Sequence, residues 1–513
     1  MGHTASGGAS RLPTRTKVAF GLGSGAESVT LYAISQFAVL YYFQVRGLSP
    51  ALAGLAVSAS LVLDAISDPF AGSLSDRTRS KWGRRHPYMF ASPIFIVLSF
   101  IAIFNPPAGL ADMGLFFWFL ACVIVMRQAM TFYHTPHLAL GGELSTDYVE
   151  RSKVMAWASF LGWAGGAASF WVATRLFFPE TPEYSNGLLN PEPWLPYSLT
   201  MGVIALLFLY GSAWFTRDRI PFLPQPPENQ PRWSPFEFFK DIARAMGNIN
   251  YVWIIVGYFF LSMMVGLRNG LHIFTNTFFW ELKTIDLSWF VIGSFLGFLT
   301  SFFVAPRVHG KFDKKLTMIV AGLSYAVVPA VPMILGLMGV MTPSTPGLVP
   351  ILIVFHGAGW CAISILNISI MSALADISDE NELKHGVRQE GVLYATRAFF
   401  AKVDAAIGTA FAGVVLGFIS FPERAKPGEV APDILYNLVA WDGLVAMIPG
   451  VLAVFFYTRY RITRSSYDAT RAALDDKKRE PTPSPTLTGV LAAEDIGSPL
   501  ENPGGSEPAP GRA

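Results

Sequence analysis

Long apolar segments alternate with short polar ones along most of this chain, from residue 18 to residue 457. Twelve such segments have enough residues to cross about 30 Å of hydrocarbon as helices that rise about 1.5 Å per residue. They cover residues 18–43, 51–74, 88–105, 112–139, 154–177, 196–216, 250–279, 287–305, 316–340, 347–374, 392–419 and 434–457. This pattern predicts an all-α polytopic membrane protein.

Composition agrees with this class. Of the 513 residues, 52% are hydrophobic and 14% are charged, which is more apolar and less charged than a soluble domain of this length. The net charge of +2 gives no reason to expect a nucleic-acid partner, and no feature indicates an obligatory protein partner. Because Cys122 and Cys361 both lie in apolar runs, we expect neither a disulfide nor a reactive thiol.

The loops between the segments alternate in basic content, which predicts their orientation. Positive loops stay on the cytoplasmic side of a membrane. The basic loops are those that hold Arg11, Arg15 and Lys17, residues 77–85, Arg151 and Lys153, residues 217–247, residues 307–315, Lys384 and Arg388, and residues 459–464. We therefore expect a multi-pass protein of the cell (inner) membrane with both termini in the cytoplasm.

The longest internal loop follows the sixth segment and divides the chain into two six-helix halves. Similar loops follow the second and eighth segments, GSLSDRTRSKWGRR and APRVHGKFDKK, as parallel repeats of a major facilitator fold would give. Topology alone also makes such loops basic. The expected divisions are a cytoplasmic N-terminus (1–17), an N-terminal bundle (18–216), a middle loop (217–249), a C-terminal bundle (250–458) and a cytoplasmic, largely disordered tail (459–513).

Two acids interrupt the second apolar segment. Asp64 and Asp68 are four residues apart, so a helix places them on one face. Carboxylates are costly in lipid unless they face an interior cavity and act there, which favours a cation site. Alternatively, Asp68 and Pro69 could cap and restart a broken helix and bind nothing.

Three separated motifs carry a resemblance to a known family. They read LDAISDPFAGSLSDRTRSKWGRRHPY, LALGGELSTDYVERSKV and ADISDENELKHGVRQEGVLYATRAFFAKVDAAIG. In order and spacing, over about residues 17–460, the chain resembles the glycoside-pentoside-hexuronide:cation symporter family. The resemblance implies a major facilitator fold that couples uptake of a solute, typically a sugar, to entry of Na⁺ or H⁺ by alternating access, with no organic cofactor.

The resemblance also implies a set of cation-coupling residues. Asp64 and Asp68 match the paired acids of the family, where Na⁺ would be held, and Ser67 and Thr131 match positions that supply oxygen ligands. Two close carboxylates repel unless a cation or a proton lies between them, so the pair suits either ion. Lys402 matches the intramembrane lysine of the family.

An ammonium group inside the membrane needs a counter-charge. Asp64 or Asp68 could supply it to Lys402 across the two halves, and Asp404 is a local competitor. Residues two apart on a helix do not face each other, which favours the interhelical partner.

The solute site departs from the family pattern. Ser28 with Glu27 beside it, His134, Leu138, Ser159 and Asn367 stand where the family's galactoside site has acids, an arginine and aromatic residues. The polar candidates are Glu27, Ser28, Arg127, His134, Arg268, Asn269, His272, Trp360 and Asn367. His134 titrates near neutral pH and could transfer a proton, or it could be a packing histidine.

A loop of opposite charges follows the second segment. Asp76, Arg77, Arg84 and Arg85 could form a cytoplasmic gate of salt bridges between the halves, or could simply obey the topology rule.

Three functions remain open at this stage. The leading one is cation-coupled symport of a sugar or glycoside. The alternative is transport of an amphiphilic or other non-sugar solute, such as a lysolipid or a drug, on the same fold. An intramembrane enzyme is disfavoured, because the chain holds no HExxH, GxSxG or phosphate-loop motif. A non-transporting sensor is disfavoured, because we expect no folded appendage in the long tail.

Overall fold

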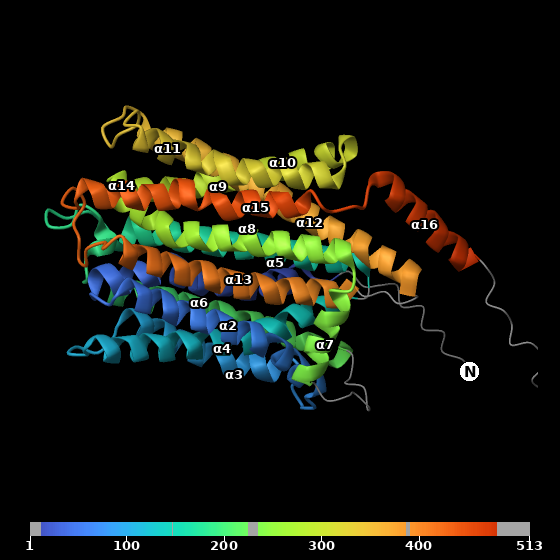
Figure 1. Ribbon diagram of the computed structural model, residues 1–513. Helices are drawn as coiled ribbons and strands as arrows, with labels where there is room; N and C mark the ends of the chain where they lie inside the picture. The colour runs from blue at the N-terminus through green and yellow to red at the C-terminus, as the bar shows by residue number, and fades with distance from the viewer. Residues whose placement is uncertain (1–11, 146, 224–233, 386–389, 480–513) are drawn as a thin grey trace, which may run out of the picture.

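The structure is a computed structural model that describes residues 12–145, 147–223, 234–385 and 390–479, and these residues form helices and connecting loops without a strand. The α-helices are α1 (Thr14–Ala33), α2 (Pro50–Arg77), α3 (His86–Phe104), α4 (Asp112–Glu143), α5 (Tyr148–Val172), α6 (Trp194–Thr216), α7 (Pro235–Ala245), α8 (Ile249–Phe274), α9 (Thr284–Lys311), α10 (Lys314–Val327), α11 (Val331–Leu337), α12 (Leu348–His385), α13 (Glu390–Phe418), α14 (Pro432–Ala440), α15 (Met447–Tyr457) and α16 (Arg464–Arg479). Figure 1 shows most of them side by side in one bundle.

Short π-helical and 3₁₀ turns extend or join these helices. The π-helical turns are Ile34–Ala38, Tyr41–Val45, Ala173–Phe177, Thr275–Phe279 and Trp441–Val445. The 3₁₀ turns are Gly187–Leu189, Arg217–Phe222 and Val328–Ala330. With these turns included, a helical segment coincides with each of the twelve predicted spans.

Ten helical segments of the described chain are long and apolar enough to cross a membrane. The two other predicted spans are α1 and α5 with the π-helical turns that follow them. Both contain many glycines and hydroxyl residues, which lower their hydropathy. They are nevertheless central in the fold, because α1 packs against α5 and α6.

The chain forms two groups of helices. In the first half α3 packs against α4 and α6, and in the second half α8 packs against α13 and α15 while α12 packs against α9 and α10. The halves meet where α2 packs against α13 and where α5 approaches α9. We call the end of the bundle that carries the loop of residues 77–86 the basic end, and the opposite end the far end.

Two helices lie outside the predicted spans, both at the basic end (Figure 1). One is α7, in the middle loop. The other is α16, in the tail that we expected to be largely disordered, of which residues 480–513 lie outside the described chain. Thr463 and Ser466 start α16 with a reciprocal cap, since the Ser466 amide donates to Thr463 Oγ1 (3.3 Å) and the Thr463 amide to Ser466 Oγ (2.9 Å).

The halves are joined at the far end. The Gln44 side chain donates to the Pro422 carbonyl (3.0 Å) and accepts from the Ala425 amide (2.8 Å). Beside this contact, the ring of Phe43 lies 5.9 Å from that of Phe274, with centroids at a distance typical of aromatic pairs. The far end is therefore packed across the interface between the halves.

Candidate functional site

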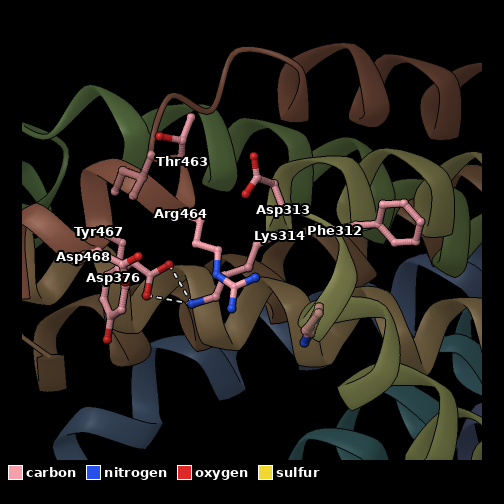
Figure 2. Close-up of a pocket in the computed structure, with 10 residues that line it drawn as sticks. Phe312, Asp313, Lys314, Asp376, Thr463, Arg464, Tyr467 and Asp468 are labelled. Atoms are coloured by element: carbon pink, nitrogen blue, oxygen red, sulfur yellow. Dashed lines mark hydrogen bonds and ion pairs between the residues drawn. The ribbon is translucent and has the colours of Figure 1, made fainter.

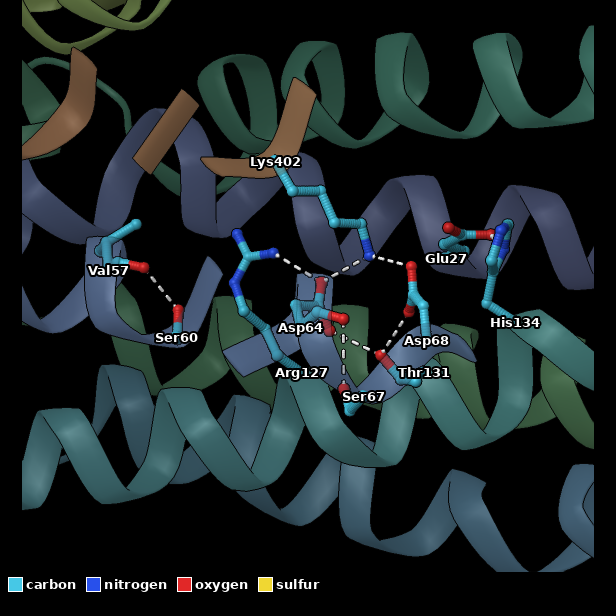
Figure 3. A network of polar contacts seen from close by, with 10 residues as sticks. All are labelled: Glu27, Val57, Ser60, Asp64, Ser67, Asp68, Arg127, Thr131, His134 and Lys402. Carbon is cyan, nitrogen blue, oxygen red and sulfur yellow. Dashed lines mark hydrogen bonds and ion pairs between the residues drawn. The ribbon is translucent and has the colours of Figure 1, made fainter. Parts of the chain in front are cut away.

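The predicted cation residues meet at the interface between the halves. Lys402 extends from α13 toward α2, and its Nζ donates to Asp64 Oδ2 (3.1 Å) and Asp68 Oδ2 (2.6 Å), as Figure 3 shows. On the other side, Thr131 Oγ1 of α4 lies 2.5 Å from Asp64 Oδ1 and 3.1 Å from Asp68 Oδ1. Three helices thus bring one ammonium, two carboxylates and one hydroxyl together.

Helix α2 sets the geometry of the two acids. It runs without a break from Pro50 to Arg77 and contains Pro69, so the alternative in which Asp68 and Pro69 restart a broken helix is wrong. The side chain of Asp64 is 9% exposed and that of Asp68 is 30% exposed. Asp64 is thus the interior member of the pair and Asp68 the more accessible one.

Two other predicted residues lie beside the acids. Arg127, a solute candidate in the sequence, is buried on α4 with Nη1 3.5 Å from Asp64 Oδ2. It therefore adds positive charge to the acid pair. Ser67, a ligand candidate, donates its hydroxyl to the backbone carbonyl of Asp64 (3.2 Å), and this bond within α2 occupies its proton.

Lys402 does not pair with Asp404, its neighbour on α13. Asp404 is fully buried, and neither carboxylate oxygen has a hydrogen-bond partner among the described residues. The interhelical partner that we favoured for Lys402 is the one the structure contains.

Glu27 and His134 form a second polar pair. Glu27 Oε2 of α1 lies 2.7 Å from Nδ1 of His134, and the two side chains remain partly exposed. Figure 3 shows this pair on the side of the acid network nearest Asp68. His137, one turn further along α4, is buried and bonds the Phe20 carbonyl (2.8 Å), so it is a packing residue.

The remaining solute candidates do not gather around this pair. Arg268 is buried and donates to the carbonyls of Tyr325 (2.8 Å) and Ala326 (2.6 Å) on α10. Asn367 accepts a hydrogen bond from Arg397 (3.2 Å). Asn269 is exposed and Trp360 is 39% exposed. Ser28 faces α5, because its Oγ lies 3.5 Å from the position that a Cβ atom on Gly162 would take.

His272 belongs to a cluster that sequence reasoning missed. Its Nδ1 lies 3.9 Å from Oδ2 of the buried Asp442, and its ring is stacked on that of His356 with centroids 5.8 Å apart. An acid inside an apolar span is a functional candidate by itself, so Asp442 could have been found by the same signal as Asp64.

Three residues of the predicted gate, Asp76, Arg84 and Arg85, are paired within the first half, and not between the halves as expected. Arg84 Nη2 and Arg85 Nη2 each lie 2.7 Å from Glu143 Oε1 at the end of α4, and Arg85 also pairs with Asp76. Glu143 was not among the predicted residues.

A separate pocket lies at the basic end, where α10, α12 and α16 meet (Figure 2). Lys314 Nζ donates to both oxygens of Asp376, each at 2.7 Å, and lies 5.2 Å from the ring centroid of Tyr467. The contact with Tyr467 attaches α16 to the second half, and the pocket lies outside the acid network.

Comparison with known proteins identifies the family. The profile of the family described as MFS/sugar transport protein matches residues 19–464. The chain belongs to this family. It is a multi-pass membrane transporter of small-molecule solutes, and not an enzyme.

Known relatives of this transporter carry names that refer to different solutes. The isoprimeverose transporter of Lactiplantibacillus pentosus is 24% identical, over 87% of this chain and 89% of the relative. A putative glycoside/cation symporter of Escherichia coli, YagG, is 24% identical over 92% and 95%. The sodium-dependent lysophosphatidylcholine symporter 1-B of Danio rerio is 25% identical over 93% and 92%. The last two of these names state coupling to a cation.

Solved structures support the fold. A D-xylose–proton symporter superposes with a TM-score of 0.57 at 15% identity, over 88% of this chain and 96% of that one. A bacterial homologue of the lysosomal transporter Spinster, in an inward-facing conformation, gives 0.58 at 13% identity, over 92% and 98%. The predicted major facilitator fold is confirmed.

Proposed function

We propose that this transporter moves a sugar or glycoside by symport with a cation that binds at Asp64 and Asp68. The observation that carries the proposal is the contact of Lys402 with both acids, because it joins the second half to the first through a single ammonium group. A bound cation would replace this ammonium and release the contact between the halves. Binding of the ion would then be linked to the movement that alternates access.

The donors around the acids fit either coupling ion. Asp64, Asp68 and Thr131 direct oxygen atoms to one place, and hard cations such as Na⁺ prefer oxygen ligands. Arg127 partly neutralises Asp64, so one added positive charge, Na⁺ or H⁺, balances the pair when Lys402 withdraws.

The Glu27–His134 pair is the proposed contact for the solute. A carboxylate and an imidazole form strong hydrogen bonds to sugar hydroxyls, and both side chains here are partly exposed beside the acid network. A lysolipid or another amphiphile is the alternative solute, supported by the similarity to a lysophosphatidylcholine symporter.

We further propose that the protein lies in the inner membrane of the cell and that its basic end faces the cytoplasm. The positive loops support this orientation.

The test is uptake by proteoliposomes under an imposed Na⁺ gradient or an imposed pH gradient. The panel contains labelled isoprimeverose, xylose, other mono- and disaccharides, and lysophosphatidylcholine. Accumulation of a sugar under one gradient supports the proposal and identifies the ion. Uptake of lysophosphatidylcholine alone would favour the amphiphile, and failure of the whole panel by folded protein would reject both.

Asp64→Asn gives a sharper test. Asparagine keeps the size of the side chain and its bond with Thr131 but removes one charge, so the fold should persist and gradient-driven accumulation should be lost. We expect exchange of sugar down its gradient to remain. The matched control is Asp433→Asn, at an exposed position in the first turn of α14. Accumulation by Asp64→Asn equal to that of the control would remove Asp64 from the coupling mechanism.

A further inference from the structure

A second carboxylate is buried in the other half of the molecule, away from the cation-coupling residues. Asp442 is 1% exposed and lies in the π-helical turn Trp441–Val445 between α14 and α15. The Thr275 hydroxyl donates to Asp442 Oδ2 at 2.8 Å, and Thr275 begins the π-helical turn Thr275–Phe279 at the end of α8. Single π-helical turns of this kind are frequent at functional sites.

The groups around Asp442 leave its charge incompletely balanced. His272 Nδ1 is 3.9 Å away, too far for a hydrogen bond but close enough for ion pairing when the ring is protonated. Arg268, one turn earlier on α8, directs its guanidinium to the carbonyls of Tyr325 and Ala326 on α10. From α10, the hydroxyl of Tyr325 is the titratable group near Asp442. From α12, the ring of His356 stacks on that of His272.

A cavity connects His272, the partner of Asp442, to the interface between the halves. The cavity measures about 60 Å³ and is lined from one half by Tyr32, Gln36 and Phe170 and from the other by His272, Ser294 and His356, among others. This volume accommodates a few water molecules. His272 Nε2 is a buried ring nitrogen without a hydrogen-bond partner in the described chain, while His356 Nε2 is 2.9 Å from Ser294 Oγ.

We propose that Asp442 and His272 form a proton-binding site of the second half, separate from the cation site at Asp64 and Asp68. A proton from cavity water would bond to His272, and the imidazolium would neutralise Asp442. Release would return the proton to water and leave the buried negative charge of Asp442 with only the Arg268 guanidinium, which forms no ion pair with it, as a counter-charge. The unprotonated state is costly inside a membrane, so whether the site holds its proton depends on how far Asp442 and His272 are exposed to water.

This inference rests on the proposed transport function for its role. The cavity lies between the halves, so their separation at the far end would expose His272 to water on that side. Transport driven by Na⁺ through the acid network would then still depend on pH, because the second half must gain or lose its own proton during the cycle.

The first experiment does not require transport. Thermal unfolding midpoints of the purified protein in detergent are measured from about pH 5.5 to about pH 8 for the wild type, Asp442→Asn and the exposed control Asp433→Asn. Because the folded site holds a proton that neutralises a buried charge, stability attributable to Asp442 should fall as the pH rises. We expect the difference between wild type and Asp442→Asn to change by at least ~2 °C over this range.

The control should differ from the wild type by the same amount at every pH. Parallel profiles for Asp442→Asn would overturn the proposal. If Asp442→Asn does not fold, His272→Gln replaces it, because this variant keeps Asp442 and its Thr275 hydrogen bond but removes the proton acceptor. Loss of the pH-dependent component in His272→Gln supports the site, and its persistence rejects the site.

The second experiment measures isoprimeverose uptake at a saturating Na⁺ gradient with equal pH on both sides. Wild-type uptake should vary with pH by up to about tenfold per pH unit, the limit for one proton, and Asp442→Asn should be flat. A flat wild-type profile would exclude a proton step in transport. If no sugar is transported, the symport proposal fails while the unfolding profiles still decide whether the proton site exists.

Discussion

At the scale of single residues, Lys402 can link binding of the cation to the contact between the two halves. Its ammonium lies 3.1 Å and 2.6 Å from two carboxylates of the other half, and its side chain is 30% exposed. The ammonium and a metal cation would compete for the same oxygen atoms, because both are attracted by the same pair of negative charges.

Lys402→Ala should therefore bind the coupling ion more readily in the purified protein and fail to release it during transport. We expect Na⁺ to raise the unfolding midpoint of this variant by at least ~2 °C more than it does for the wild type, and gradient-driven accumulation to be lost. The control is Lys384→Ala, which removes an exposed lysine paired with Glu380. Equal effects of Na⁺ on both variants would contradict competition between Lys402 and the cation.

At the scale of helices, close backbone contacts position the site. A methyl group on Gly165 of α5 would lie 2.5 Å from the carbonyl oxygen of Gly25 on α1, and a backbone atom cannot rotate away. This contact sets the distance between α5 and the helix that carries Glu27. Helix α16 is held differently, by side chains on one face: Tyr467, Arg471 and Leu474 are spaced to lie together.

Gly165→Ala should push α1 and α5 apart and destabilise the protein by about 1–3 kcal/mol, the usual range for overpacking. Thermal unfolding measures this loss. Gly142→Ala in α4 is the control, because no atom lies within 4 Å of the position of its added methyl. If Gly165→Ala unfolds at the same temperature as the wild type, the two helices can move apart with little loss of stability.

Leu474→Ala should release α16 from the second half. Leu474 is 3% exposed, and Arg471 adds an ion pair to Asp379 at 3.5 Å. Loss of about 2 kcal/mol of packing corresponds to ~30-fold faster amide hydrogen exchange within α16. The exposed Asp476→Ala should leave exchange unchanged. Equal exchange in both variants would show that Leu474 does not hold the helix.

At the scale of the whole molecule, the described conformation joins the halves at the far end and at the acid network. Arg175 of the first half donates to Ser288 Oγ of the second at 2.8 Å, and Asn186 Oδ1 accepts from Thr284 at 3.0 Å. Together with the contacts of Gln44, these bonds must break for solute to enter from the far end.

A cross-link at the far end should therefore stop transport. Gln44→Cys and Ala425→Cys, in a background with Cys122 and Cys361 replaced by alanine, join the halves where Gln44 Oε1 now accepts from the Ala425 amide at 2.8 Å. We expect a short bifunctional thiol reagent or oxidation to abolish sugar uptake. Reduction should restore uptake after oxidation, and each single cysteine is a control. Full uptake by the cross-linked protein would mean that the far end need not open.

The sequence determined the architecture because a bilayer imposes simple requirements on length and hydropathy. The twelve apolar segments located every helical span, although the tenth, 347–374, ends eleven residues before α12 does. The paired acids marked α2 as the helix that faces an interior site. Local signals were also present for α16, in the cap formed by Thr463 and Ser466, although the polar composition of the tail obscured them.

Tertiary structure alone decided which polar residues meet. Arg127 and His134 share a face of α4, yet they have different partners. Because of how the neighbouring helices pack, Arg127 pairs with Asp64 and His134 pairs with Glu27. Asp442 and His272 are 170 positions apart and meet because α8 and the α14–α15 segment pack together. The spacing along one helix fixes a direction, but the partner depends on the rotation and depth of another helix, which no local pattern of residues contains.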